Sequence, residues 1–286
     1  MGQVMLYHSD YWHIKTYGDP NNHAILFLHG FMGDGDDWAA VIRGFMDNYY
    51  CITVDLPGHG KTRIRDWKRG YGMPETAKAV ICLIDGLRIS RCAIVGYSMG
   101  GRLALYLILH YPERFGKGVL ESASPGLRKK AERVVRITHD DQIASELGKT
   151  PFDKFLDKWY LQSIFGALRG HPDFQDLLCK RKKNVPGELA RSLRDMGTGK
   201  QASLWADLRN NRVPLLFLAG ELDTKFSSIA YGMEQACPQS RVEIIAGCGH
   251  NIHFEKPGIF IESIKGFLKG NIEKEVRIFK NQDVAF

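Results

Sequence analysis

The sequence predicts an α/β domain built on a mostly parallel sheet, with a helical segment inserted between two of its strands. Short apolar runs rich in β-branched residues alternate with amphipathic helical patterns, and this alternation is typical of parallel strands covered by helices on both faces. The alternation stops over residues 123–211, which are charged, helical in pattern and without a strand-like run. With 286 residues, the chain is long enough for one large domain or two small ones.

The expected elements follow one another along the chain. Near-continuous apolar runs are expected to form the strands: Ala24–Gly30, Tyr49–Leu56, Cys92–Ser98, Gly116–Ser122, Val213–Gly220 and Arg241–Gly247. Amphipathic helices are expected at Asp37–Met46, Pro74–Leu87, Met99–Tyr111, Ser227–Ala236 and Pro257–Leu268. We therefore expect residues 1–122 and 212–286 to form the core, and residues 123–211 to form a helical lid over the carboxyl edge of the sheet.

The composition argues against several classes of function. The formal net charge of +7 is too diffuse to indicate a nucleic-acid partner, and the longest apolar runs are far shorter than a membrane span. The six cysteines include no C-x-x-C pair, which disfavours a zinc site or a redox motif. The N-terminal residues show no secretory signal, so we expect a cytoplasmic location. The number of subunits is left open.

A serine stands at the sharpest expected bend, between a strand and a helix. Residues Gly96-Tyr97-Ser98-Met99-Gly100 match the G-x-S-x-G pattern of a nucleophile elbow. The glycines leave room for the turn, and the helix that follows directs its amide dipoles toward the serine. An ordinary strand-to-helix turn with an incidental serine is the alternative, but the flanking strand and helix favour the elbow.

Such a serine needs a histidine that takes its proton and an acid that orients the histidine. We expect His250 to be the base, because it follows a strand in a glycine-containing loop, and His253 is the competing candidate. Asp223 follows the end of another strand and is the expected acid, with Glu221 as the weaker candidate. The sequence therefore predicts a triad of Ser98, His250 and Asp223.

Backbone N–H groups should stabilise negative charge that develops on a substrate. Met99, directly after the serine, is expected to provide one of them, and Phe31, after the strand that ends at Gly30, the other. His29, Asp55 and His59 lie in loops after the first two expected strands. We expect these three to fix the loops rather than to take part in chemistry.

Cationic side chains near the serine indicate an anionic substrate. Arg102 stands four positions after Ser98, hence on the same helix face, where it would bind a carboxylate or pair with an acid at the edge of the core. The lid begins with a basic run that includes Arg133 and Arg136, although such a run is often only a solvated face. Trp159 would form an aromatic wall of the site or belong to the lid core.

Several motifs together resemble a known superfamily. The stretches "LHGFMG", "VDLPGHGKT", "GYSMGG" and "GCGH" resemble the α/β-hydrolase superfamily over most of residues 20–270 outside the lid, and the order of serine, aspartate and histidine is the one expected of that fold. "VGYSMGGRLALYL", "LESASPGL" and the arginine-rich lid start resemble one family within it. That family is 2-succinyl-6-hydroxy-2,4-cyclohexadiene-1-carboxylate synthase, of menaquinone (vitamin K2) and phylloquinone biosynthesis.

This resemblance implies substrate-binding residues. In the family, an arginine just after the serine, an arginine in the first lid helix and a tryptophan later in the lid meet the substrate carboxylates. These positions match Arg102, Arg136 and Trp159, with Arg133 as the runner-up for the lid arginine. Tyr97, beside the serine, also fits the family pattern.

The resemblance further implies a lyase that eliminates pyruvate from 2-succinyl-5-enolpyruvyl-6-hydroxy-3-cyclohexene-1-carboxylate, a small-molecule tri-carboxylate. The triad would then act as a general base, and no metal or cofactor is implied. Two alternatives stay open. The first is a carboxylesterase or C–C bond hydrolase with the same triad, and the second is a non-enzymatic relative used as a receptor or scaffold.

Overall fold

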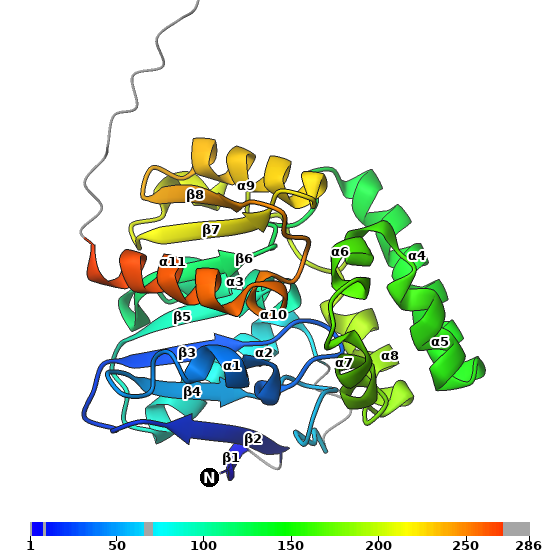
Figure 1. The fold of residues 1–286 in the computed structure, drawn as a ribbon, viewed down its shortest axis with the longest axis horizontal. Helices are drawn as coiled ribbons and strands as arrows, with labels where there is room; N and C mark the ends of the chain where they lie inside the picture. Colours follow the sequence, from blue (N-terminus) through cyan, green and yellow to red (C-terminus); the bar gives the residue numbers. More distant parts are fainter. Residues whose placement is uncertain (1, 8–9, 66–70, 271–286) are drawn as a thin grey trace, which may run out of the picture.

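An eight-stranded sheet runs through the computed structural model, which describes residues 2–7, 10–65 and 71–270 (Figure 1). Its strands are β1 (Gly2–Tyr7), β2 (Asp10–Tyr17), β3 (Ala24–Leu28), β4 (Tyr50–Val54), β5 (Cys92–Tyr97), β6 (Phe115–Glu121), β7 (Leu215–Gly220) and β8 (Ser240–Ile245). Their order across the sheet is β1-β2-β4-β3-β5-β6-β7-β8. Strands β3 to β8 pair in parallel, whereas β1 and β2 add an antiparallel edge.

The expected fold class is confirmed, and each expected strand is present within a few residues of its expected bounds. Strands β1 and β2 were not expected. The sequence of β2, DYWHIKTY, mixes polar and apolar residues, because an antiparallel strand near a sheet edge needs only part of its surface buried. It therefore lacks the continuous apolar run by which the parallel strands were recognised. Residues 271–286, which we assigned to the core, lie outside the described part of the chain.

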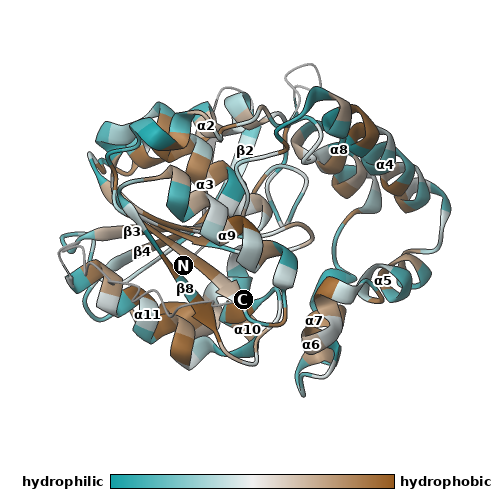
Figure 2. Cartoon of the chain, turned by 90° about the horizontal axis from the view of Figure 1, so that it is seen from above, coloured by the Kyte–Doolittle hydropathy of each residue, from teal (hydrophilic) through white to brown (hydrophobic). Residues whose placement is uncertain are grey.

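Helices cover both faces of the sheet (Figures 1 and 2). One face carries α2 (Met73–Gly86), α3 (Met99–His110) and α9 (Thr224–Ala236), and the other carries α1 (Ala39–Ile42), α10 (Ile252–Glu255) and α11 (Pro257–Lys269). The helix expected at 37–46 is shorter than predicted, because it starts as a 3-10 turn at Gly35–Trp38 and gives way to turns after Ile42. Among the described helices, none has both the length and the apolar character needed to cross a bilayer.

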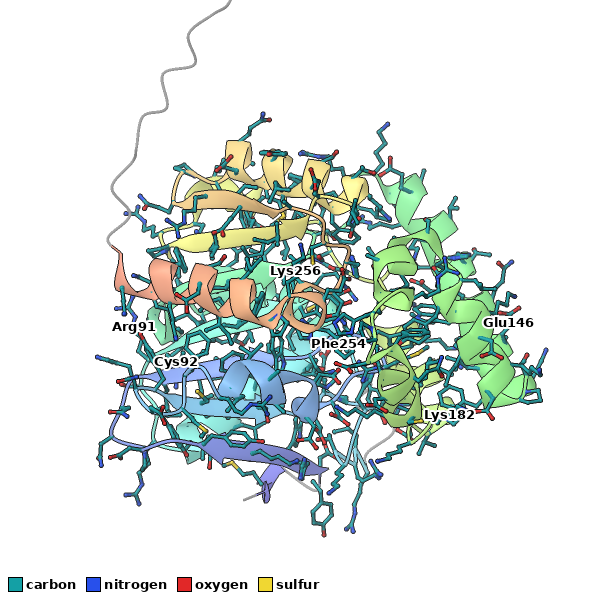
Figure 3. The ribbon with its side chains drawn as sticks, in the orientation of Figure 1. Arg91, Cys92, Glu146, Lys182, Phe254 and Lys256 are labelled. Carbon is teal, nitrogen blue, oxygen red and sulfur yellow. The ribbon has the colours of Figure 1, made fainter. Side chains whose placement is uncertain are left out.

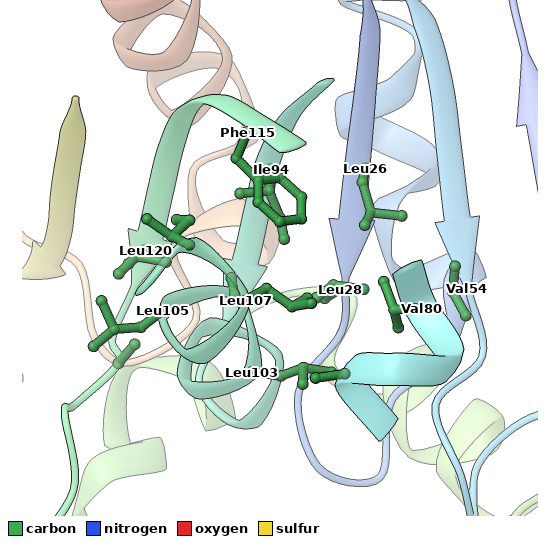
Figure 4. Close-up of a cluster of buried hydrophobic side chains, with 14 of the residues drawn as sticks. Leu26, Leu28, Val54, Val80, Ile94, Leu103, Leu105, Leu107, Phe115 and Leu120 are labelled. Carbon is green, nitrogen blue, oxygen red and sulfur yellow. The ribbon is translucent and has the colours of Figure 1, made fainter. Parts of the chain in front are cut away.

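The parallel strands are buried on both faces, which explains their continuous apolar runs. Leu26 and Leu28 of β3 and Ile94 of β5 point toward α2 and α3, where they pack with side chains such as Leu103 and Leu107 (Figure 4). The residues that alternate with them in these strands pack on the opposite face, in a second cluster with α1 and α11. This packing on both sides holds the carboxyl ends of β3, β5, β6 and β7 in fixed positions.

Five helices connect β6 to β7 and lie together beside the carboxyl edge of the sheet (Figure 1). They are α4 (Lys130–Lys149), α5 (Phe152–Tyr160), α6 (Gly166–Arg169), α7 (Phe174–Arg181) and α8 (Pro186–Met196), and all lie within the range expected for the lid. Their apolar residues form a cluster of their own, which also includes Met32 from the loop after β3. Phe254 of α10 lies where these helices meet the core (Figure 3). Its ring centroid lies 4.8 Å from that of His171, between α6 and α7.

Candidate active site

The turn after β5 holds Ser98 in a strained backbone conformation. Its φ of 50° and ψ of −106° lie outside the regions that L-residues usually adopt, as expected of a nucleophile elbow. The flanking glycines are required, because a Cβ at Gly96 would lie 2.5 Å from the carbonyl oxygen of Gly100 and a Cβ at Gly100 would collide with the carbonyl of Leu28. The N–H of Ser98 donates to the carbonyl of Glu121 at the end of β6 (2.8 Å), so the neighbouring strand supports the turn.

Ser98, His250 and Asp223 form one hydrogen-bonded chain across the carboxyl edge of the sheet. The Oγ of Ser98 lies 3.2 Å from Nε2 of His250, and Nδ1 of His250 lies 2.5 Å from Oδ2 of Asp223. His250 and Asp223 are buried, whereas Ser98 is half-buried. The ring of Phe226 packs against the imidazole, with centroids 4.7 Å apart. This geometry allows the imidazole to take a proton from the serine hydroxyl.

The competing histidine and acid make other contacts. His253 pairs through Nδ1 with Oε2 of Glu121 (2.7 Å) and stacks on Trp38 with ring centroids 4.3 Å apart. Glu221 accepts a hydrogen bond from the N–H of Gly247 (2.7 Å) and so ties the end of β7 to the loop after β8. Both residues therefore support the loops behind the triad.

The two residues expected to provide the oxyanion hole line the same cavity as Ser98. Met99 is the first residue of α3, where an N–H has no partner within its own helix. Phe31 follows β3 and stands next to Gly30. Because Gly30 has no side chain, the ring of Tyr97 can pack directly against its backbone. Phe31, Met99 and Ser98 line one cavity, so their arrangement suits an oxyanion hole.

The three residues that were expected to fix loops, His29, Asp55 and His59, form hydrogen bonds with backbone groups. His29 donates from Nδ1 to the carbonyl of Gly30 (2.7 Å) and accepts at Nε2 from the N–H of Leu56 (2.9 Å). Asp55 accepts hydrogen bonds from backbone N–H groups of two loops. Burial, with a further contribution from His29, lowers the pKa of His59 to about 3. His59 is therefore neutral at physiological pH.

A cavity of about 460 Å³ lies between the triad and the lid helices. Cationic side chains line it from several elements: Arg102, Arg128, Lys129, Arg136, Arg181 and Lys225. Among the described lining residues, Glu132 is the only acid. A surface hollow of about 500 Å³ over β8 and α11 contains none of the expected site residues. The charge around the triad therefore favours an anionic ligand.

Arg102 is a buried cation with neutral partners. It is 8% exposed, and it donates from Nη1 to Oε1 of Gln201 (2.9 Å) and from Nη2 to the carbonyl of Met196 (2.7 Å). Burial, reinforced by the nearby charge of Arg136, lowers the pKa of Arg102 to about 10. A carboxylate in the cavity would relieve this unfavourable environment, because it would supply the missing opposite charge.

The first lid helix contributes a second arginine. Of the two candidates, Arg136 lines the cavity and Arg133 does not. The Nε of Arg136 lies 2.7 Å from Oδ1 of Asp140, which is buried one turn further along α4. Since Asp140 is the acid that acts on both Arg136 and Arg102, the cluster of two guanidinium groups and one carboxylate keeps a surplus positive charge.

Trp159 and Tyr97 form aromatic parts of the wall. The ring centroid of Trp159 lies 5.5 Å from that of Phe31 and 6.0 Å from that of Phe155, so the residue serves both as cavity wall and as part of the lid core. Tyr97 is buried, and its ring centroid lies 5.5 Å from that of His250. Burial raises the pKa of Tyr97 well above its ordinary value, so its hydroxyl stays protonated.

Two further arginines line the cavity, of which the sequence pattern gave Arg181 no place in the site and Arg128 only a place in the basic run at the start of the lid. Arg181 of α7 is buried and donates two hydrogen bonds of 2.8 Å to Asp37. Although burial opposes it, the charge of Asp37 raises the pKa of Arg181. In the sequence it stands within the run KRKK, which indicates only a solvated face. Arg128, named in no predicted role, stacks its guanidinium 3.6 Å above the ring centroid of Trp205.

The chain is similar to known proteins of one fold family. The chain matches the alpha/beta hydrolase fold family over residues 23–257. It is 31% identical to the 2-succinyl-6-hydroxy-2,4-cyclohexadiene-1-carboxylate synthase of Pectobacterium atrosepticum, over 85% of this chain and 93% of that protein. It is 33% identical to the chloroplastic protein PHYLLO of Arabidopsis thaliana, of which it spans 15%. The solved structure of MenH from S. aureus matches with a TM-score of 0.84 and 34% identity, over 90% of this chain and 97% of that one.

Proposed function

This chain belongs to the 2-succinyl-6-hydroxy-2,4-cyclohexadiene-1-carboxylate synthase family within the alpha/beta hydrolase fold family, and from that membership we propose that it is a carbon–oxygen lyase. The proposed substrate is 2-succinyl-5-enolpyruvyl-6-hydroxy-3-cyclohexene-1-carboxylate, and the products are pyruvate and 2-succinyl-6-hydroxy-2,4-cyclohexadiene-1-carboxylate. The observation that carries the proposal is the cavity, because its lining is rich in cations and keeps a surplus of positive charge after Arg181 pairs with Asp37 and Arg136 with Asp140, as suits a substrate with three carboxylates.

The proposed reaction begins at the ring carbon next to the succinyl ketone. The Oγ of Ser98 takes the proton from this carbon while its own proton passes to Nε2 of His250, and Asp223 stabilises the resulting imidazolium. The electron pair of the C–H bond forms a new ring double bond, the existing double bond moves by one position, and the C–O bond to the enolpyruvyl group breaks. Enolpyruvate takes up a proton at its methylene carbon and becomes pyruvate, and His250 returns to its neutral form.

A serine hydroxyl is a weak base, so this step depends on stabilisation of the enolate that forms. In our proposal, the N–H groups of Phe31 and Met99 donate to the ketone oxygen as negative charge develops there. Because these donors belong to the backbone of fixed loops, they need little reorganisation during the reaction. Removal of one such preorganised donor typically lowers kcat by about a hundredfold or more.

The cations bind the carboxylates in this proposal. Arg102 has charge to offer, since its present partners are the neutral oxygens of Gln201 and Met196. Arg136 would take a second carboxylate from the lid side, and Trp159 and Tyr97 would enclose the ring. These contacts hold the carbon acid over Ser98 and so determine which atom of the substrate meets the hydroxyl.

The test measures pyruvate release by the purified protein. We expect turnover of the enolpyruvyl substrate, detected through lactate dehydrogenase and NADH, and its loss in Ser98→Ala. The matched control is Ser228→Ala, because Ser228 is an exposed serine of α9 whose hydroxyl donates to the carbonyl of Thr224 (2.9 Å). A p-nitrophenyl ester is assayed in parallel. Fast hydrolysis of the ester without pyruvate release would instead identify a carboxylesterase or C–C bond hydrolase.

We also propose that the protein works in the cytoplasm on this small-molecule substrate. All six of its cysteines are free, as is usual in a reducing compartment. The exposed thiols of Cys82 and Cys179 should therefore be reduced in the cell. They should react with a thiol reagent that is added as the cells are opened, under conditions that prevent oxidation.

A further inference from the structure

A second serine at the carboxyl edge of the sheet shares the positive φ of Ser98. Ser122 directly follows β6 and has a φ of 46°. The described residues include four non-glycine positions with positive φ: Met32, Arg88, Ser98 and Ser122. A serine in this region is less stable than a glycine would be, so the side chain at Ser122 is retained at a conformational cost.

The hydroxyl of Ser122 is buried without a protein partner. The residue is 1% exposed, and its Oγ has no hydrogen-bond partner among the described residues. Its backbone is fixed, since its N–H donates to the carbonyl of Leu218 on β7 (2.8 Å). The residue is nevertheless one of those that line the cavity of the triad, so a small adjustment on ligand binding would bring its hydroxyl to the cavity wall. An unsatisfied buried hydroxyl is a second cost, and a ligand in the cavity would remove it.

We propose that Ser122 is a substrate-binding residue whose hydroxyl donates a hydrogen bond to an oxygen of the bound anionic substrate. This inference rests on the proposed function, because it assigns a contact within the same site. The order of strands gives the direction of the contact. Phe31 follows β3, on one side of β5 and its serine, whereas Ser122 follows β6, on the other side. With the ketone oxygen held at Phe31 and Met99, Ser122 meets an oxygen on the opposite side of the reacting carbon.

Two substitutions separate the hydroxyl from the backbone conformation. Ser122→Ala removes the hydroxyl and keeps the Cβ, whereas Ser122→Gly removes the hydroxyl and also suits a positive φ. The matched control is Arg88→Gly, because Arg88 has a φ of 61° in an exposed loop after α2, away from the cavity. For each variant, kcat/KM for pyruvate release and Tm are measured. The rate at which a neutral p-nitrophenyl phosphonate modifies Ser98 reports whether the triad is intact.

We expect both Ser122 variants to lose about tenfold to a hundredfold in kcat/KM, the usual effect of one hydrogen bond to a charged group. Modification of Ser98 should stay within about twofold of the parent rate, since the triad does not use Ser122. Ser122→Gly should have a higher Tm than Ser122→Ala, and Arg88→Gly should raise Tm without changing kcat/KM.

Unchanged kcat/KM in Ser122→Ala would overturn the inference while leaving the lyase function in place. A parallel loss of Ser98 modification would also overturn it, because Ser122 would then support the elbow rather than bind substrate. If Ser122→Ala does not fold, Ser122→Gly carries the test, since glycine is the residue best suited to this backbone. Absence of pyruvate release by the parent protein would refute the proposed function itself, and the inference with it.

Discussion

Replacing Arg102 by methionine should lower activity and raise stability. The two effects have opposite signs because the guanidinium is buried with neutral hydrogen-bond partners, so its charge is unfavourable without a bound anion and useful only when an anion binds. Methionine has a similar length and fills the space without a charge. A residue that bridges elements of the fold would behave differently, since its loss would reduce activity and stability together.

The stability gain follows from the pKa of Arg102. Burial lowers it from 12.5 to about 10, and a shift of about 2.5 units corresponds to about 3 kcal/mol. Because the folded pKa is below the unfolded one, the charged form is disfavoured by folding at every pH below about 10, and the full penalty applies at pH 7. The lost hydrogen bonds to Gln201 and Met196 offset part of it, at about 1 kcal/mol each. We therefore expect a gain of about 1–3 kcal/mol.

The activity loss follows from a two-point contact with a carboxylate. Hydrogen bonds to charged groups contribute about 1.5–3 kcal/mol each, so the loss of two should reduce kcat/KM for the tri-carboxylate about 10²- to 10⁴-fold. Hydrolysis of a neutral ester should change by less than about threefold, because such a substrate has no charge for Arg102 to meet. Chemical denaturation and the two kinetic assays are run on the same preparation.

Two results would refute this reasoning about Arg102. The first is a variant that loses stability, which would mean that the hydrogen bonds to Gln201 and Met196 hold α3 against α8 and the segment after it. The second is an equal loss on the charged and the neutral substrate, which would mean that the arginine shapes the cavity without binding the carboxylate.

Three further predictions concern the elbow, a loop and the lid. Gly100→Ala should abolish turnover and lower the free energy of unfolding by about 2 kcal/mol or more, because its Cβ collides with the carbonyl of Leu28; unchanged denaturation curves would contradict this. The free energy of unfolding of the parent should fall by about 2 kcal/mol between pH 7 and pH 5, because the pKa of His59 is 6.5 in the unfolded chain and about 3 in the folded one, so that the unfolded chain binds the proton first. Denaturation of His59→Gln at the two pH values should show a smaller change. A change as large as that of the parent would exclude His59 as its source. Asp37→Asn leaves the charge of Arg181 buried without its carboxylate, so we expect the free energy of unfolding, measured by urea denaturation, to fall by about 3–5 kcal/mol. A fall of less than about 1 kcal/mol would mean that solvent reaches the pair.

The parallel part of the sheet was predictable because its strands obey one strong rule. A strand buried on both faces must be apolar at nearly every position, so runs such as AILFL and YCITV stand out without any knowledge of their neighbours. Strand β2 obeys a weaker rule, since its partners cover only some of its side chains. Its existence depends on pairing with β4, and pairing between distant segments leaves no local pattern in the sequence.

The hydrogen-bonded chain of serine, histidine and aspartate was predictable for a related reason. Ser98, Asp223 and His250 each follow a strand, and the strands bring their carboxyl ends to one edge, so local position was enough to expect the three together. Arg181 could not be found in this way. Its contact with Asp37 comes from the packing of α7 against the 3-10 turn Gly35–Trp38, which depends on how the lid folds back over the core. The same holds for Ser122, whose positive φ is a property of the folded chain alone.

The choice between elimination and hydrolysis lies in the lid and the buried cations, not in the triad. The Ser98 hydroxyl can attack a carbonyl carbon or remove a proton, and the atom held nearest to it decides which reaction occurs. A neutral ester can approach with its carbonyl over the serine, because nothing charged directs it. In our proposal, a tri-carboxylate is oriented by Arg102 of α3 and Arg136 of α4, which both line the cavity, at points remote from the reacting carbon. Substitutions at those arginines should therefore change which reaction dominates, whereas substitutions in the triad should slow both reactions.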